Sequence, residues 1–234
     1  MKFLITSGGT VVYIDSVRKI SNMSKGTFGS KIAAEAVLKD IDVNFLYAVG
    51  SKLPSPFFCE SEANGKSSEF AQKIELVEYV TFDDYAARLD EQLALQPDIV
   101  ILAAAVSDYG VENYVDGKLR SGEDLVIRLK PLPKLISTVR AKCPNCVLCG
   151  FKLLVKSSAE ELRAAAVDSL FKNKCDLIVG NDLADIRNND HKLTIVERKE
   201  EYDYDISYYT SKDVDLAKVV VEKCLEHYNR KKRA

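Results

Sequence analysis

Short apolar runs alternate with helix-like segments along almost the whole chain, and this alternation restricts the fold more than any other feature. Residues 99–103 contain no polar side chain, which is typical of a strand that is buried on both faces of a parallel sheet. The same reasoning predicts further strands at residues 2–6, 43–49, 74–79, 125–129, 147–151 and 177–180, and helices at 29–39, 81–95, 133–142 and 157–174. The remaining segments predict a β-hairpin at 193–197 and 202–206, and a helix that begins at Thr210. We therefore expect an α/β, Rossmann-like fold with a mostly parallel sheet, helices on both faces and a C-terminal β-hairpin.

Length and charge favour one domain and argue against some partners. The 234 residues suit a single domain over residues 1–234, without internal repeats. Lys and Arg number 33 against 35 Asp and Glu, so the net charge is -2, whereas a protein that binds nucleic acid through its phosphates carries a basic excess. No apolar run is long enough for a signal peptide or a membrane helix. We expect a soluble, cytoplasmic protein that binds neither nucleic acid nor membranes.

Cys143, Cys146 and Cys149 have a spacing that could suit a metal site. A structural zinc site needs four ligands, usually as two pairs, and the other cysteines and both histidines are scattered along the sequence. Cys149 also falls inside a predicted buried strand. Reduced, unpaired thiols are therefore favoured over a zinc site.

Two glycine-containing segments lie between the first predicted strand and the first predicted helix. Residues 7–10 read Ser-Gly-Gly-Thr, and residues 21–29 read Ser-Asn-Met-Ser-Lys-Gly-Thr-Phe-Gly before the first helix. Small residues let the backbone approach a ligand, and the free amides of a helix N-terminus favour phosphate. A phosphate-binding turn at residues 27–29 is one interpretation, and glycines that only allow close packing are the other.

The segment between the first strand and the first helix is unusual for a dinucleotide-binding fold. Such folds place their glycines in one short turn, whereas here about twenty residues intervene. The insertion carries an acid, a base and an amide: Asp15, Arg18 and Asn22. It indicates a substrate site more than a plain NAD site.

A second candidate region follows the strand at residues 99–103. Ala104 and Ala105 offer a flat backbone surface that could accept a base, and Asp108 lies at the ligand-binding end of the strand. The alternative is a surface aspartate in a turn.

Taken in order, these motifs resemble the phosphopantothenate–cysteine ligase family. The resemblance rests on residues 7–10, 14–29 and 103–109, on Gly-Lys-Leu-Arg-Ser at 117–121, which looks like the family's lysine loop, and on Gly-Asn-Asp at 180–182. It extends to about residue 198. Because the chain begins at the first strand, and because residues 150–155 are similar to standalone bacterial forms, a standalone ligase without the flavin-dependent decarboxylase is expected.

The resemblance implies a two-step reaction. The phosphopantothenate carboxylate attacks the α-phosphate of a nucleoside triphosphate, and the cysteine amine then displaces the nucleotide monophosphate. The resemblance favours CTP over ATP, implies Mg²⁺ as the ion, and implies a homodimer.

The same resemblance implies roles for individual residues. Lys118 would offset the repulsion between the two reacting anions, with Arg120 as a second cation where Ser121 departs from the family pattern. Asn22 would donate to the oxyanion of the second step, and Arg18 would bind a phosphate. Asp108 would orient the nucleotide or its metal ion. The expected nucleotide site comprises Gly8, Gly9, Ser24, Gly26, Phe28, Gly29, Ala104, Ala105, Asp108 and Lys172.

Three alternatives remain open from the sequence. Lys172 or Lys174 could reach the triphosphate, or both could simply occupy a helix C-terminus that favours lysine. The chain could be an NAD(P)-dependent Rossmann-type oxidoreductase, although no Tyr-x-x-x-Lys pair accompanies a catalytic helix. It could also be a nucleotide-binding module without catalysis.

Overall fold

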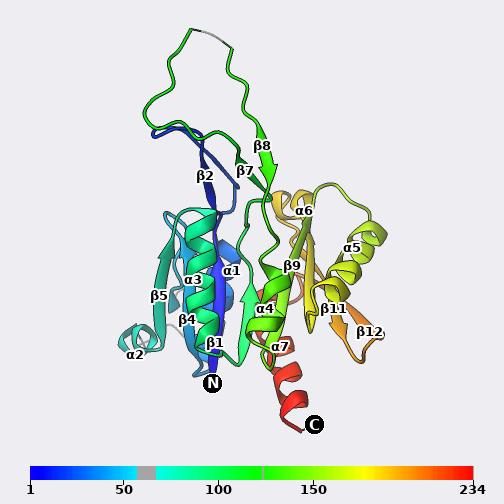
Figure 1. Cartoon of the computed structure of the whole chain (residues 1–234). Coiled ribbons are helices and arrows are strands. Elements are labelled where there is room, and N and C mark those ends of the chain that lie inside the picture. The colour runs from blue at the N-terminus through cyan, green and yellow to red at the C-terminus, as the bar shows by residue number, and fades with distance from the viewer. Residues whose placement is uncertain (57–66, 123, 234) are drawn as a thin grey trace.

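A computed structural model describes residues 1–56, 67–122 and 124–233, and an eight-stranded sheet forms the centre of the described chain (Figure 1). The strand order is β12-β11-β10-β9-β6-β1-β4-β5. Six strands run parallel: β1 (Lys2–Ser7), β4 (Asp42–Ala48), β5 (Ile74–Tyr79), β6 (Ile99–Leu102), β9 (Val147–Leu154) and β10 (Leu177–Asp182). The last two, β11 (Lys192–Arg198) and β12 (Tyr204–Thr210), add an antiparallel hairpin at one edge. The predicted fold class is confirmed.

The direction of strand addition reverses at β1. The chain adds β4 and β5 on one side of β1, and then β6, β9 and β10 on the other. In open sheets of this kind, the crevice at the carboxyl ends of the strands beside the reversal is where ligands bind.

Helices cover both faces of the sheet (Figure 1). One face packs against α1 (Thr27–Leu38), α7 (Leu216–Arg233) and Phe70 of α2 (Ser67–Gln72). The other face packs against α3 (Phe82–Ala94), α4 (Ile136–Lys142) and α5 (Ala159–Lys172). A short helix, α6 (Leu183–Arg187), follows β10 directly. No helix among the described residues is both long enough and apolar enough to cross a bilayer.

Two predicted helix starts are confirmed by their caps. The Thr81 hydroxyl accepts from the Asp84 amide at the start of α3, at 3.1 Å. Ser158 and Glu161 form a reciprocal capping box at the start of α5.

Other predicted boundaries were wrong. The strand predicted at residues 125–129 begins only at Leu129, because the pairing of β8 with β7 starts at Leu129 and Val111. The helix predicted from Pro133 begins at Ile136, and the helix predicted from Thr210 begins at Leu216, where Asp215 accepts from the Ala217 amide. Residues 60–68 are mostly polar, which is typical of an exposed loop; residues 60–66 lie outside the described residues, and the last two open α2.

The sequence did not predict two small antiparallel pairs near the carboxyl ends of the strands. The insertion after β1 forms a hairpin of β2 (Val11–Tyr13) and β3 (Lys19–Ser21). Strands β7 (Tyr109–Val111) and β8 (Leu129–Pro131) form the base of a long projection. We call β7, β8 and the described residues between them the arm. It extends away from the sheet beside the β2–β3 hairpin (Figure 1).

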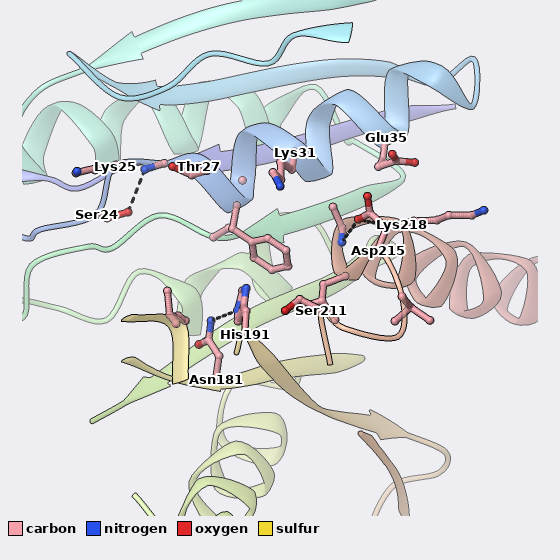
Figure 2. A pocket seen from close by; sticks show the side chains of 18 of the residues that line it. Ser24, Lys25, Thr27, Lys31, Glu35, Asn181, His191, Ser211, Asp215 and Lys218 are labelled. Carbon is pink, nitrogen blue, oxygen red and sulfur yellow. Dashed lines mark hydrogen bonds between the residues drawn. The ribbon is translucent and has the colours of Figure 1, made fainter. Parts of the chain in front are cut away.

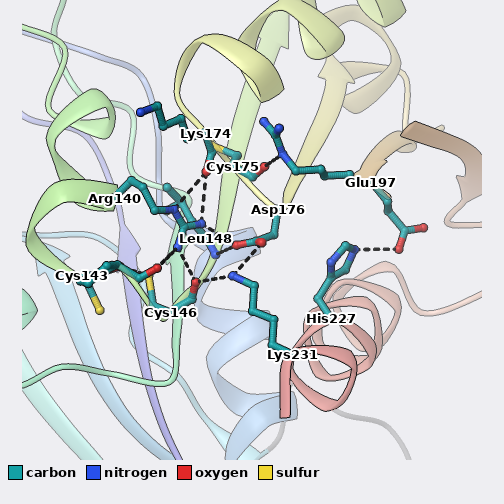
Figure 3. A network of polar contacts seen from close by, with 12 residues as sticks. Arg140, Cys143, Cys146, Leu148, Lys174, Cys175, Asp176, Glu197, His227 and Lys231 are labelled. Atoms are coloured by element: carbon teal, nitrogen blue, oxygen red, sulfur yellow. Dashed lines mark hydrogen bonds and ion pairs between the residues drawn. The ribbon is translucent and has the colours of Figure 1, made fainter. Parts of the chain in front are cut away.

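At the opposite end of the sheet, charged contacts fix the C-terminal helix (Figure 3). Buried Asp176 pairs with Arg140 at 2.6 Å and with Lys231 of α7 at 2.8 Å. Glu197, also buried, pairs with Lys223 at 3.0 Å and with His227 at 3.2 Å, both on α7. These contacts hold α7 from Lys223 to Lys231 against the sheet.

The cysteines near this network do not form a metal centre. Cys146 donates to the carbonyl oxygen of Cys143, while Cys149 packs on the other face of the sheet. Burial, together with the neighbouring Cys143, raises the pKa of Cys146 to about 12. Within the described parts of the chain, no three potential metal-binding side chains lie together, and the five cysteines there are unpaired and buried.

Candidate active site

The turn before α1 is built from glycines that must stay small. Gly26 precedes the helix with a φ of 71°, a left-handed conformation that glycine adopts without strain. A Cβ on Gly29 would lie 2.5 Å from the Ser7 hydroxyl, so only glycine lets α1 approach the end of β1 this closely. The Ser7 hydroxyl in turn donates to the Gly26 carbonyl at 3.0 Å.

The first turn of α1 has free backbone amides. No side chain caps the helix, and its first turn carries no acidic residue. In the described structure, no protein group accepts from the amides of Thr27, Phe28 or Gly29. Because such amides and the helix dipole attract anions, this turn is a ready phosphate site.

A cavity of about 1000 Å³ opens at this turn. Its walls come from the segment before α1, from one side of α1, from the ends of β6 and β10, and from the segment that leads into α7 (Figure 2). Of the predicted nucleotide-site residues, Ser24, Gly26, Phe28 and Gly29 line it. Five lysines and three acids also line it: Lys25, Lys31, Lys39, Lys212, Lys218, Glu35, Asp213 and Asp215. The excess of lysine favours a polyanionic ligand.

His191 also lines the cavity, although the sequence analysis gave it no role. Its ring packs edge-on against Phe28 with centroids 4.9 Å apart, and its Nε2 lies 3.4 Å from the Asn181 amide nitrogen (Figure 2). Burial lowers the pKa of His191 below 6.5, and Lys31 lowers it further against an opposing effect of Asp185. The imidazole is therefore neutral at pH 7 and can accept a proton.

The sequence contained a signal for His191. It comes just before β11, which pairs antiparallel with β10. When two strands pair antiparallel, the start of one lies at the same edge of the sheet as the carboxyl end of the other. His191 therefore had to fall beside Asn181.

Asn22 lies at the junction between the insertion and the end of β6. Its side-chain amide donates to the Ala105 carbonyl at 2.8 Å. Gly9 forms a parallel bridge with Ala105, and a Cβ on Gly9 would lie 2.8 Å from the Asn22 carbonyl. Gly8, with a φ of 89°, packs against Ala48 at the end of β4.

The backbone of Ala104 and Ala105 is already engaged. The Ala105 amide donates to the Gly8 carbonyl at 2.7 Å, and the Ala105 carbonyl accepts from both Thr10 and Asn22. The Ala104 amide donates to the Thr6 hydroxyl at 3.3 Å. These groups hold the strand ends together, so the backbone N–H groups of the surface that could accept a base already have partners within the chain.

Asp15 ties the β2–β3 hairpin to the arm. Its buried carboxylate accepts from the amides of Val17, Arg18 and Leu119 and from the Arg18 guanidinium at 2.5 Å. Burial raises the pKa of Asp15, but these hydrogen bonds outweigh it and hold the pKa at about 2. Arg18 is thereby fixed beside the arm, with its guanidinium partly exposed.

Other predicted residues lie outside the cavity. Lys118 and Arg120 are exposed on the arm. Asp108 is also exposed and pairs with Lys134 at the base of the arm. Lys172 ends α5 and Lys174 follows it, at the amino end of β10, whereas the cavity adjoins the carboxyl end of that strand. This placement suits a helix C-terminus that favours lysine.

The model of one protein family, the DNA/pantothenate metabolism flavoprotein C-terminal domain, matches residues 1–227. The chain belongs to this family. Among curated proteins, it is 33% identical over 198 residues to the coenzyme A biosynthesis bifunctional protein CoaBC of Thermococcus kodakarensis, covering 84% of the chain and 45% of that protein. It is 32% identical over 183 residues to the CoaBC protein of Methanocaldococcus jannaschii, covering 78% of the chain and 41% of that protein. The chain thus spans less than half the length of each of these relatives.

Two solved structures share the fold of this chain. The DNA/pantothenate metabolism flavoprotein from Streptococcus pneumoniae superposes with a TM-score of 0.78 at 27% identity, covering 98% of this chain and 99% of that one. A Cab2 mutant in complex with phosphopantothenate-cysteine superposes with a TM-score of 0.81 at 22% identity, covering 99% and 87%. Both superpositions cover nearly the whole chain, so they include the sheet and the helices that surround the cavity.

Proposed function

We propose that the chain is a phosphopantothenate–cysteine ligase of coenzyme A biosynthesis. The observation that carries this proposal is the uncapped start of α1, whose free amides open into a lysine-rich cavity that Ser24, two residues after Asn22, also lines. Membership of the flavoprotein C-terminal domain family, with CoaBC proteins among the relatives, supports the pathway. The complex of a Cab2 mutant with phosphopantothenate-cysteine supports the product.

The first step joins two anions. A carboxylate oxygen of phosphopantothenate attacks the α-phosphorus of the nucleoside triphosphate, and pyrophosphate leaves. The α1 amides and the cavity lysines offset the negative charge, and Lys118 adds its charge from the arm. Arg18, held by Asp15, binds a phosphate oxygen.

The second step transfers the acyl group. The cysteine nitrogen attacks the acyl carbon, the nucleotide monophosphate leaves, and the nitrogen loses a proton. A side-chain amide has two donor hydrogens, and in Asn22 one is used by the Ala105 carbonyl. The second remains to donate to the oxyanion. Neutral His191 accepts the proton from the amine.

CTP is the proposed co-substrate, and Mg²⁺ the proposed ion. Mg²⁺ usually binds through one or two carboxylates together with substrate phosphates, so an ion carried by the nucleotide needs few protein ligands. Asp108 is the carboxylate that would contribute to its shell. Bound in this way, the ion would neutralise phosphate charge.

A homodimer is part of the proposal. The arm exposes several large apolar side chains: Tyr109, Tyr114, Val115, Leu125, Val126, Ile127 and Leu129. An exposed apolar group of this size marks an interaction surface, and a second copy is the partner that we propose. We also propose a cytoplasmic location, which the five buried, unpaired cysteines of the described chain support.

Pyrophosphate release tests the ligase proposal. The purified protein is incubated with phosphopantothenate and Mg²⁺ and with either CTP or ATP, with and without cysteine. We expect release with CTP at a kcat/KM much higher than with ATP, and phosphopantothenoylcysteine only when cysteine is present. Similar kcat/KM values would overturn the nucleotide preference alone. Nucleotide binding without release would favour a binding module, and cofactor reduction with NADP⁺ would favour an oxidoreductase.

A further inference from the structure

The turn of the β2–β3 hairpin is joined to the arm by backbone contacts on both sides of Lys118. The Ser16 amide donates to the Gly117 carbonyl at 3.0 Å, and the Gly117 amide donates to the Ser16 hydroxyl at 2.9 Å. On the other side, the Leu119 amide donates to the Asp15 carboxylate at 3.1 Å. Lys118 is therefore an exposed side chain on a backbone that is held at the residues before and after it.

The two oxygens of the buried Asp15 carboxylate make different contacts. Oδ1 accepts from the amides of Val17 and Arg18, at 2.8 and 2.6 Å, and so closes the hairpin turn. Oδ2 accepts from the Arg18 guanidinium at 2.5 Å and from the Leu119 amide. The same guanidinium nitrogen donates to the Leu119 carbonyl at 3.4 Å. A single oxygen thus fixes the Arg18 side chain relative to the backbone beside Lys118.

Both cations beside this carboxylate can still reach a ligand. The Arg18 side chain is 40% exposed, although Asp15 holds one of its nitrogens. The exposed Lys118 side chain has no hydrogen bond or ion pair among the described residues. Closing the hairpin turn requires only Oδ1 of Asp15, so the contacts of Oδ2 serve a further purpose. A polyanion is bound most strongly by charges that are already in position when it arrives.

We infer that Asp15 is a positioning residue, which sets Arg18 and Lys118 relative to each other so that both meet the phosphates of the nucleoside triphosphate. This inference rests on the proposed function, in which both cations act in the first step. Asp15 itself touches no substrate. Its loss should therefore weaken the effect of both cations together.

Two substitutions separate the contacts of the two oxygens. In Asp15→Asn, an amide oxygen can still close the turn, but the amide nitrogen cannot accept and would face two donors, the Arg18 guanidinium and the Leu119 amide. Asp15→Ser keeps an oxygen that can close the turn, as serine does in similar turns, and has no second oxygen for the arm. Both variants should fold, because the hairpin and the arm lie outside the eight-stranded sheet.

Single-turnover release of pyrophosphate, with saturating CTP, phosphopantothenate and Mg²⁺, tests the inference. Both Asp15 variants should release pyrophosphate about tenfold or more slowly than the wild type, the scale of displacing a group that acts on the substrate. Asp116→Asn, a change to an exposed acid of the arm that contacts Ser16, is the matched control and should keep the wild-type rate.

A double-mutant comparison distinguishes positioning from a general effect on the fold. In a chain that carries both Arg18→Gln and Lys118→Gln, adding Asp15→Asn should change the rate by less than about twofold, because the groups that it positions are gone. An equal slowing in that background would overturn the inference, since Asp15 would then act through the fold alone.

Two other results would also overturn it. One is a folded Asp15→Asn or Asp15→Ser variant that releases pyrophosphate at the wild-type rate. The other is a variant that is monomeric in the assay and regains the wild-type rate when concentrated, because Asp15 would then act through the interface of the arm. The ligase proposal survives all of these results, whereas a wild type that releases no pyrophosphate overturns the ligase proposal as well.

Discussion

Asn22 and His191, the two side chains proposed to act in the second step, are held in place by neighbouring groups of the protein. Asn22 cannot rotate freely, because the Ala105 carbonyl takes one of its amide hydrogens. Phe28 fixes His191 from one side, and the Asn181 amide lies next to its ring nitrogen. Such orientation before substrate arrives is what makes a hydrogen-bond donor or a base effective in catalysis.

Asn22→Asp should separate the two steps of the reaction. The carboxylate cannot donate to the oxyanion and repels it, while the first step needs no donor at this position. We expect a burst of pyrophosphate with little product, and a second step that is about a hundredfold slower, the scale of losing one oxyanion donor. Rapid-quench kinetics and mass spectrometry of the bound acyl-nucleotide provide the measurement. If the variant releases no pyrophosphate but handles supplied intermediate normally, Asn22 acts in the first step.

His191→Gln should change the pH dependence of the second step. With a pKa below 6.5, His191 of the wild type becomes protonated as the pH falls through that range, so the rate of acyl transfer should fall there. The variant should lose this acid limb, should be about a hundredfold slower at pH 7, and should recover partly at higher pH, where more cysteine is already unprotonated. His227→Gln, which removes the histidine bonded to Glu197 at the far end of the sheet, is the control and should keep the limb. An unchanged acid limb in His191→Gln would exclude it as the base.

At the scale of elements, the sequence predicted the sheet because each central strand contains an apolar run of at least three residues. Residues 99–103, for example, have no polar side chain, and β6 is fully buried. The small pairs β2–β3 and β7–β8 have only three residues per strand, which is too few for a periodic pattern. Their positions are set by distant contacts, such as those of Asp15 with Leu119, which no local pattern reveals.

In the candidate site, too, the sequence predicted what depends on a local segment and missed what depends on contacts between distant segments. The glycine turn before α1 was recognisable, because free amides and small residues are properties of a local segment. Glu35 and the residues before α7 were not, because they meet only when α1 and α7 pack together on one face of the sheet. Lys172 lies at the amino end of β10 and does not line the cavity, so its contact with the triphosphate stays a prediction.

Asp15→Asn should loosen the contact between the β2–β3 hairpin and the arm. The folded pKa of about 2 is below the unfolded value of 3.8, so the carboxylate stabilises the fold above pH 4, and this contribution is lost as the pH falls toward 2. The difference in Tm between wild type and variant should therefore be greatest near neutral pH and should shrink between pH 4 and pH 2. Hydrogen exchange at pH 7 should be faster in residues 11–21 and 115–120 of the variant. A Tm difference that does not change with pH would show that Asp15 acts through packing alone.

At the scale of the whole molecule, the arm is the segment whose exposed apolar surface most favours an interaction with a second copy. It projects from the sheet (Figure 1), it carries Lys118, and it exposes apolar side chains that a soluble domain normally buries. Val126 is 82% exposed, and Tyr114 and Leu125 are each 54% exposed. Scattered apolar residues are ordinary on a surface, but a cluster on one projection indicates a partner.

Val126→Glu should therefore separate the proposed homodimer. A charge buried without a partner in an apolar interface is strongly unfavourable, so the variant should sediment as one 26.1 kDa chain where the wild type sediments as two. Leu95→Glu, a change to a side chain that is 54% exposed at the end of α3, is the matched control and should remain dimeric. Circular dichroism should be unchanged in both variants, because neither side chain contributes to the core. Because the arm carries Lys118, loss of the dimer should also slow pyrophosphate release. A wild type that is monomeric and fully active at assay concentration would show that the arm serves another purpose, and a dimer that survives Val126→Glu would place the interface elsewhere.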